Sequence, residues 1–474
     1  MKVQILSQQH PAYNAALLAD VAALYEGGKL WHDRLDVFLP KKEQESVTSY
    51  AERKGRAAYE NDMAPIIDLL IGKLFETPAA VSGLPAGWLA DVDGRGTSWS
   101  TWWREVATNA ARDQRAFIWI NFPPPAEVPP TDAADEAARG LARPTLVSVP
   151  ATLAPNWIDD EEGNLDAVMI RDVCTVQATL IEPQKTVYRW TAIDEVGISR
   201  WEWTAQQGRA SPGPEDDAGQ VMNVAHNRPD VPVVRLQFSP GLHIGGKLRD
   251  PVVALTGLAN DLDWALHRGA HAVMVIATEG GVVPVLGAGA YLNIGSNDAV
   301  SFAEPGGACY GALAERIEVR REGVYRVTHQ MGASVGTKGA GASGASKDLD
   351  WRALEIVLDA YADAVRAAML ATALRVADVW RVAPASIQIT GLDGWDAADM
   401  QALLTAAQLA VPMVKSETFR REVAKQTAAG LLPDASDEVL SAITKELDDA
   451  DYSEQPGFAP SSGPLDPNAD PAVG

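Results

Sequence analysis

The segment Gly241–Leu248 (GLHIGGKL) is a near-match to a phosphate-binding loop, because its glycines and Lys247 follow a predicted strand and precede a predicted helix. The phosphate-loop pattern places Ser or Thr directly after the lysine, since that hydroxyl binds magnesium. Leu248 occupies this position. Asp250 and Pro251 follow, and they favour a mobile strand-to-helix loop in which Asp250 caps a helix and Pro251 takes its first position. We favour this loop over a nucleotide site.

Histidine chemistry gives no stronger signal. None of the seven histidines belongs to an H-E-x-x-H zinc motif. His267 and His271 are four residues apart and could share a helix face, but no acid lies between them to act as a base. We interpret this pair as packed against its neighbours. The sequence therefore predicts no cofactor, no metal site and no catalytic residue, and we expect that the protein is not an enzyme.

The segment Gly332–Ser346 (GASVGTKGAGASGAS) is rich in glycine and alanine and lies between two helical patterns, 312–331 and 347–380. Its one charge is Lys338, and Lys347 follows at its exit. In a phosphate loop the residues around Lys338 would come in a different order. Glycine gives a backbone wide conformational freedom. The sequence predicts a flexible joint that moves against a partner.

Length and charge limit the class of protein. A chain of 474 residues predicts two to four domains with a large buried core. Its 63 acidic and 40 basic residues give a formal net charge of −23, and such a surface repels nucleic acid, which argues against an open DNA-binding face. Part of this excess is local, because the segment 434–474 contains ten acids and only one base, Lys445.

The expected environment is reducing and aqueous. Two cysteines, Cys174 and Cys309, do not make a disulfide scaffold, and we expect both to be reduced. The first residues, MKVQILSQQHPAYN, have no pattern of a signal peptide. The apolar run 365–379 contains Arg366 and Arg375, which argues against a membrane span. We expect a soluble protein that is made inside the cell.

Hydrophobic periodicity predicts helices first, then strands, then helices again. The predicted helices are 12–27, 43–76 with a kink at Pro65, 99–113, 251–272, 312–331, 347–380, 395–410, 415–428 and 436–449. The predicted strands are 115–122, 145–149, 165–179, 185–193, 199–205, 231–238, 273–277, 282–286 and 386–390, with a turn at Gly163-Asn164. Trp88, Trp99, Trp102 and Trp103 are interpreted as core and subunit-contact residues rather than ligand contacts. An α-then-β block over about 1–240 indicates an α+β fold.

Five segments in this order resemble the tailed-bacteriophage portal proteins, and within them a portal-like group classified as a domain of unknown function. The similarity covers most of 30–450. Its segments are 57–81 with its G-x-x-F-x-x-P ending, 143–172 with its Asn-Trp and turn, 228–271 with a Pro-x-x-Pro, strand, loop and helix, 292–334, and the glycine-rich loop with the long helix after it.

This resemblance implies a subunit with an α+β wing, a helical stem, a small β-containing clip, a long tunnel helix and a helical crown. Carried onto this chain, the expected regions are 1–250 for the wing with a flexible Pro-rich insertion at 123–144, 251–272 for the first stem helix, 273–311 for the clip, 312–331 for the second stem helix, 332–346 for the tunnel loop, 347–380 for the long helix, 381–450 for the crown, and 451–474 for a disordered acidic tail. At about 1.5 Å per residue the long helix would measure roughly 50 Å, with one buried stripe at Leu354, Leu358, Tyr361, Val365, Met369, Ala373 and Val376.

The resemblance further implies a ring of about twelve copies at one capsid vertex, with double-stranded DNA passing through its channel during packaging and ejection. The implied partners are the terminase large subunit, a head–tail adaptor, the major capsid protein and a scaffold protein, with no membrane. The implied location is the virion, and the host cytoplasm during assembly. A net-negative ring would hold few phosphates, so that DNA slides through it.

The predicted DNA-channel residues are Lys338, Lys347, Gly332, Gly336, Gly339, Gly341 and Gly344. Two alternatives stay open at this point. The lysines either lie nearest the DNA or only keep a solvent-exposed loop soluble. The chain is either a portal subunit or another capsid, tail or scaffold protein without a channel.

Overall fold

The structure is a computed structural model. It describes residues 1–122, 143–177, 179–206, 209–226, 228, 230–269, 273–277, 299–303, 308–328, 344–393, 416–431 and 437–449. The chain divides into two compact units, Met1–Trp395 and Asp396–Gly474. The first unit is a mixed helix-and-sheet fold, which confirms the α+β prediction.

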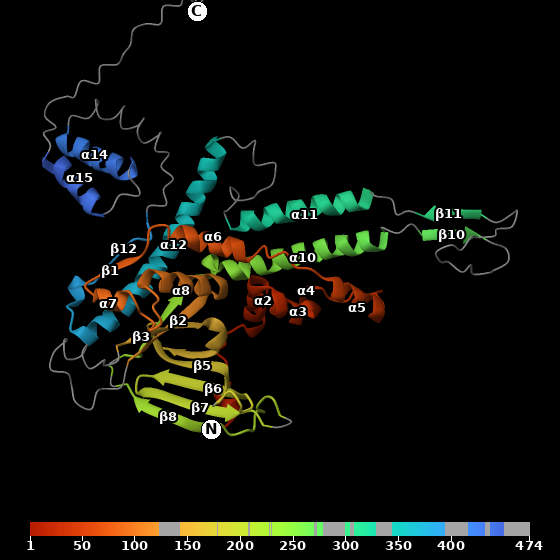
Figure 1. The fold of residues 1–474 in the computed structure, drawn as a ribbon, viewed down its shortest axis with the longest axis horizontal. Helices are drawn as coiled ribbons and strands as arrows, with labels where there is room; N and C mark the ends of the chain where they lie inside the picture. The colour runs from red at the N-terminus through yellow and green to blue at the C-terminus, as the bar shows by residue number, and fades with distance from the viewer. Residues whose placement is uncertain are drawn as a thin grey trace, which may run out of the picture. The chain divides into compact units, whose positions relative to one another are not determined.

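The chain begins with helices, continues with a run of strands and ends mainly in helices (Figure 1). The helices are α1 (Val3–Leu6), α2 (Ala15–Glu26), α3 (Gly28–Asp33), α4 (Leu35–Phe38), α5 (Val47–Arg56), α6 (Ala64–Leu74), α7 (Ala86–Leu89), α8 (Trp99–Asp113), α10 (Ile244–Gly269), α11 (Ala308–Val327), α12 (Gly344–Ala377), α14 (Glu417–Leu431) and α15 (Asp437–Asp449). The strands are β1 (Ala80–Ser82), β2 (Arg115–Asn121), β3 (Thr145–Pro150), β4 (Asn156–Asp159), β5 (Leu165–Val176), β6 (Lys185–Asp194), β7 (Gly197–Thr204), β8 (Gly219–Ala225), β9 (Val233–Gln237), β10 (Val273–Ala277), β11 (Ala299–Ala303) and β12 (Gln388–Thr390).

Three layers form the centre of the first unit. Strands β3, β2 and β9 make an antiparallel sheet in that order. Because side chains alternate along a strand, Ile118 and Ile120 of β2 face the main core with α6, α8 and α12, whereas Phe117 faces a second core with Trp157 and Val168 of the next sheet. The small sheet therefore separates a helical layer from a larger sheet.

The larger sheet has five antiparallel strands in the order β4-β5-β6-β7-β8. Trp190 and Trp203 lie in a third core, which the short helix α1 covers through Val3 and Leu6. Gly163 has a φ of +87° in the turn before β5, a conformation that favours glycine. The predicted Gly163-Asn164 turn is confirmed.

The predicted single helix over 43–76 is wrong. Two helices, α5 and α6, are separated by residues 57–63. The Asn61 side chain accepts hydrogen bonds from the backbone N–H of Met63 and Ala64 and so supplies the cap of α6. Pro65 lies in the first turn of α6 instead of kinking a longer helix, where its missing N–H costs nothing.

Helix α12 has 34 residues and continues as a 3₁₀ turn over 378–380. All seven residues of its predicted stripe are buried, and Tyr361 packs against Phe238 with ring centroids 4.5 Å apart. Buried Thr372 donates to the carbonyl of Ala368 within the same helix, which satisfies its hydroxyl. After α12 the chain turns back along the first unit, where β12 pairs with β1.

The predicted core role of Trp88, Trp99, Trp102 and Trp103 is confirmed, because all four side chains are buried and form edge or tilted contacts with one another. Most predicted strands are present, while β1, β4 and β8 were not predicted as separate strands. The predicted strand 282–286 and helix 395–410 lie outside the described residues, as do 123–142 and 450–474.

The second unit contains two described helices, α14 and α15, which pack together through an ion pair between Lys425 and Asp448. Across the described ranges, no helix combines the length and the apolar character that crossing a bilayer requires.

Candidate nucleic-acid interface and the helices that position it

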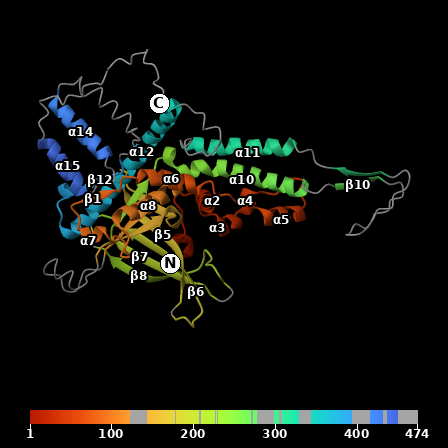
Figure 2. The ribbon, with the colours of Figure 1, turned by 45° about the horizontal axis from the view of Figure 1, so that its top comes forward.

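Helices α10 and α11 lie side by side and antiparallel (Figures 1 and 2). Strands β10 and β11, which pair antiparallel, lie between them in the chain. At the base of this hairpin, Val252 and Leu255 of α10 and Val324 of α11 belong to the main core. Farther along α10, Leu266 is 43% exposed. The hairpin is therefore anchored at its base and leaves the core towards β10 and β11.

Asn260 fixes α10 to the segment between α5 and α6. Its side-chain amide donates to the carbonyl oxygen of Ala58 at 2.8 Å, and its side-chain oxygen accepts from the Ala58 N–H at 2.9 Å. One buried side chain thus satisfies both backbone groups of a residue that belongs to no helix or strand. Such two-sided pairing resists sliding of α10 along its neighbour.

Asp20 joins α2 to α10. Its buried carboxylate accepts hydrogen bonds from Arg249 of α10 at 2.6 and 3.0 Å and from Arg34 next to α3. Both arginines are about a quarter exposed, so their charges stay in contact with solvent while the acid is enclosed. Asp20 thus connects three segments of the chain, because it lies on α2 and pairs with one arginine of α10 and one next to α3.

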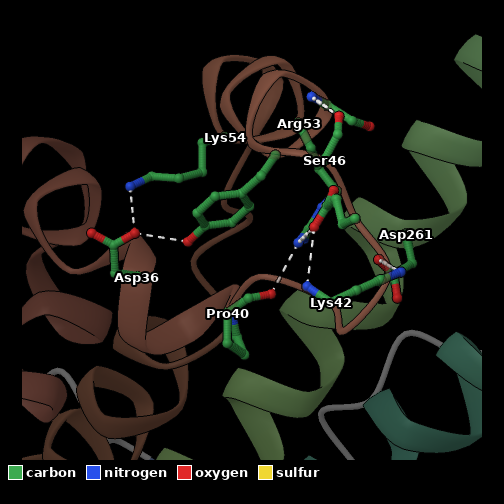
Figure 3. A network of polar contacts seen from close by, with 10 residues as sticks. Asp36, Pro40, Lys42, Ser46, Arg53, Lys54 and Asp261 are labelled. Atoms are coloured by element: carbon green, nitrogen blue, oxygen red, sulfur yellow. Dashed lines mark hydrogen bonds and ion pairs between the residues drawn. The ribbon is translucent and has the colours of Figure 1, made fainter.

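A polar network holds α5 beside α10 (Figure 3). Arg53 donates to both oxygens of Glu45 at 2.8 Å and to the carbonyl of Pro40 at 2.9 Å. This fork-to-fork pairing lowers the pKa of Glu45 to about 2, because the hydrogen bonds from Arg53 favour the carboxylate. In the same segment before α5, Lys42 binds Asp261 of α10 at 2.7 Å.

A cavity of about 120 Å³ lies next to this network, between α5 and α10. Its lining residues are Arg53, Arg56, Asn260, Asp263, Trp264 and His267. His267 lies against the Trp264 ring, with the ring centroids 5.9 Å apart, which agrees with the prediction that it packs against a neighbour. His271 lies outside the described residues. Within those residues, no cluster of three His, Cys, Asp or Glu side chains could hold a metal ion.

Arg321 fixes the base of α11. Its guanidinium binds Glu60 at 2.8 Å and Glu318 at 3.1 Å, and it lies 3.6 Å from Asp62. Burial raises the pKa of Asp62, and the neighbouring charge of Arg321 partly opposes this rise. The pairing connects the segment before α6 to the helix that leads into the glycine-rich connection.

The glycine-rich connection joins the end of α11 to the start of α12. The predicted channel residues Gly332, Gly336, Lys338, Gly339 and Gly341 lie outside the described residues. Gly344 is the first residue of α12 and Lys347 lies in its first turn, so the helix begins inside the predicted loop.

The start of this connection, GASVG at 332–336, matches the G-x-S-x-G pattern of a nucleophile elbow. An elbow lies between a strand and a helix, whereas the described element before this sequence is helix α11. The context for a nucleophilic serine is therefore missing from the described elements.

The predicted loop at 241–250 is wrong, because α10 begins at Ile244 and Pro251 lies inside the helix. The glycines there serve close packing. A Cβ atom on Gly245 would lie 2.0 Å from the Arg112 carbonyl oxygen, and one on Gly246 would lie 2.6 Å from Nδ1 of His243. His243 is itself buried, with Nε2 3.0 Å from the Arg112 carbonyl oxygen, and burial lowers its pKa. These contacts set α10 directly against the end of α8.

The charge of the hairpin is almost balanced. Helices α10 and α11 contain seven Lys or Arg and six Asp or Glu residues, in a chain of net charge −23. Two of these cations, Arg249 and Arg321, are paired with acids of the same chain. Seven bases against six acids leave a net charge of only +1 on the two helices, and tight binding of DNA needs many contacts between cations and phosphates.

Sequence reasoning missed the residues that anchor the hairpin: Asp20, Ala58, Glu60, Asn260 and Arg321. The partners in each contact are more than 200 positions apart. Single polar residues carry no periodicity that would link them across such a distance. The one available signal was Asn260, a polar residue among the apolar residues of α10.

No protein-family model matches the sequence, and no curated protein matches it. Among solved structures, the chain is similar to a chain from the virion of a native gene transfer agent (GTA) particle. The identity is 10% and the TM-score is 0.46, and the alignment covers 86% of this chain and 99% of that chain. A similarity of this degree carries no argument about function.

Proposed function

We propose that this chain is a phage portal subunit, which forms a ring of about twelve copies at one capsid vertex. The ring is a channel for DNA packaging and ejection and a docking site for terminase and the head–tail adaptor. The supporting observation is the order of elements after residue 243. A helix leads out of the core, a β-ribbon follows, a second helix returns, and a glycine-rich connection precedes a helix of 34 residues.

In this proposal α10 and α11 are the two stem helices, β10 and β11 belong to the clip, and 332–346 is the tunnel loop. The anchoring contacts at Asp20, Asn260 and Arg321 support such a role, since stem helices must hold their position while DNA moves past them. The balanced charge of α10 and α11 agrees with a channel that guides DNA without binding it tightly.

The proposal includes no catalytic step. ATP hydrolysis for packaging belongs to the separate terminase subunit, and the isolated chain is expected to hydrolyse no nucleotide. A steady-state ATPase assay of the purified chain tests this point, and turnover above background would contradict it.

Negative-stain electron microscopy of the purified protein tests the ring. Rings of about a dozen subunits with a central hole are expected. A stable monomer at high protein concentration would refute the proposal, and closed assemblies without a hole would favour a capsid, tail or scaffold protein without a channel.

The tunnel loop needs a separate experiment. Deletion of 335–344 should leave ring assembly intact while DNA packaging or retention decreases. If the deleted protein forms no rings, the segment is structural and its assignment as a tunnel loop is wrong.

A further inference from the structure

The hairpin of β5 and β6 extends beyond the other strands of its sheet. Its register continues to the pair Val176 and Lys185, whereas β4 pairs with β5 no farther than Met169. On the other edge the N–H of Ala205, which follows β7, still donates to the carbonyl oxygen of Thr186 at 2.8 Å. A two-stranded ribbon is marginally stable by itself in water. The end of β5 therefore lacks a neighbour on its outer edge, and the tip lies beyond the last contacts with the rest of the sheet.

The tip of the hairpin is an ordered turn with two large aliphatic side chains. The N–H of Glu182 donates to the carbonyl oxygen of Thr179 at 3.2 Å, and Gln177 donates to the carbonyl oxygen of Glu182 at 2.7 Å. Leu180 and Ile181 occupy the two central positions of this turn and are 97% and 96% exposed. Turns favour Gly, Pro, Asn, Asp and Ser at such positions.

The choice of residues at the tip thus opposes both turn chemistry and the hydrophobic effect. Neither side chain gains a contact inside the chain that would compensate. Residues that break local rules in this way are typical of functional sites, and exposed aliphatic side chains on an ordered turn are suited to insertion into another apolar surface.

Helix α12 also has a row of exposed aliphatic side chains. Opposite its buried stripe, Ile356, Leu370 and Leu374 are all exposed, Ile356 by 71%. Their spacing of 14 and 4 residues places them on one face of the helix. Asp359 and Asp363 are exposed on or next to this face, and Asp363 is paired with Arg366 at 3.3 Å. The side chain of Lys185, at the base of the tip, has no ion pair or hydrogen bond among the described contacts, and its charge is complementary to that of Asp359.

We propose that the tip Thr179–Glu182 is a docking arm, which inserts Leu180 and Ile181 against the exposed face of α12 in a second copy of the same chain. This inference rests on the proposed ring. The two surfaces belong to different elements, and within one copy both are exposed to solvent. A contact between unlike surfaces repeats from copy to copy and closes into a ring when the rotation permits.

The substitution Leu180→Asp with Ile181→Asp tests the arm, and Val196→Asp is the matched control. Val196 is also aliphatic and 79% exposed, and it lies in the turn between β6 and β7 of the same sheet. The double variant should raise the concentration for half-assembly by about 100-fold or more, since burial of each aliphatic side chain is worth about tenfold or more in affinity. The control should assemble like the natural protein.

Folding does not confound this experiment, because the substituted side chains are almost fully exposed. Near-ultraviolet circular dichroism of the tryptophans in the sheet confirms the fold of each variant. Ile356→Asp tests the acceptor in the same way and should weaken assembly to a similar degree. If the double variant assembles at the concentration of the natural protein, the docking arm is refuted while the proposed function stands.

A photo-crosslinking amino acid at position 180 identifies the occupant. The expected product is a crosslink between two copies that maps to residues 354–378. Crosslinks from assembled rings that map to any other segment overturn the inference but not the ring. A natural protein that stays monomeric at every concentration overturns both.

Discussion

Replacement of Gly245 by alanine tests how α10 is held at the base of the hairpin. A Cβ atom at this position would lie 2.0 Å from the carbonyl oxygen of Arg112 and 2.9 Å from Cγ1 of Val21. The first of these neighbours is backbone and cannot rotate away. Helix α10 would have to move by about 1 Å or more from α8, and such overpacking costs about 3 kcal/mol.

Gly257 provides the opposite case on the same helix. Its Cβ position has no heavy atom within 4 Å, so alanine fits without displacement. Alanine has a higher helix propensity than glycine, and Gly257→Ala should stabilise the protein by about 0.5–1 kcal/mol. The same chemical change is thus expected to act with opposite sign at two positions of α10.

Urea unfolding, followed by tryptophan fluorescence, measures both effects. The unfolding midpoint should fall for Gly245→Ala and rise slightly for Gly257→Ala, relative to the natural protein. If Gly245→Ala unfolds at the same urea concentration as the natural protein, the close contact between α10 and α8 is refuted. Equal destabilisation by both variants would show that packing at Gly245 is not the cause.

Three further predictions concern the anchors of the hairpin. The pKa of Glu45 is lowered from its ordinary 4.5 to about 2, so its pair with Arg53 stabilises the fold above pH 4.5 and this contribution is lost as the pH falls towards 2; Glu45→Gln should reduce the difference between urea midpoints at pH 5 and pH 3, and an unchanged difference would contradict the assignment. Asn260→Ala removes three hydrogen bonds, two with Ala58 and one with the carbonyl of Thr256, and should cost about 2–3 kcal/mol in urea unfolding. Amide exchange in the segment before α6 should be faster, and unchanged exchange there would refute its anchoring role. Arg321→Met leaves Asp62 without its cation and should cost about 1–2 kcal/mol, since the pair is partly exposed; a double-mutant cycle with Asp62→Asn should show coupling, and additive losses would show that the pair does not interact.

The sequence predicted elements whose signal is periodic or compositional. The stripe on α12 was predicted residue by residue, because a buried helix face repeats its apolar residues every three to four positions. The tryptophans of α8 were correctly assigned to the core, since large aromatic side chains at helical spacing rarely stay exposed. Local patterns of this kind lie within one element and need no knowledge of its partners.

Proline was the main source of error in the helix boundaries. Pro65 and Pro251 are both compatible with a helix start, but only Pro65 lies there. The difference is not local. Asn61 provides a cap before Pro65, whereas the residues before Pro251 continue as a helix because Gly245 and Gly246 allow α10 to pack tightly against α8. Gly245 and Gly246 therefore favoured a loop in the sequence, whereas in the structure they allow two helices to pack closely.

The anchoring residues were invisible for a related reason. Asp20 or Asn260 alone predicts only a polar position. Their importance comes from partners that the fold brings together from distant segments. The exposed tip at Leu180 and Ile181 is different, since two aliphatic residues inside a strand-to-strand connection are an anomaly that the sequence does contain. The sequence did not predict the turn that places Leu180 and Ile181 at its centre.

The distribution of burial along α10 connects these observations. Near its base, Val252 and Leu255 have almost no exposed surface, while Leu266 near its other end is 43% exposed. The polar anchors Asp20 and Asn260 also bind the base half and the middle of the helix. Helix α10 is thus fixed at its base and middle by buried polar contacts, and Leu266 stays exposed farther out. Together with the docking arm on β5 and β6, this gradient favours a subunit whose structure is completed by assembly.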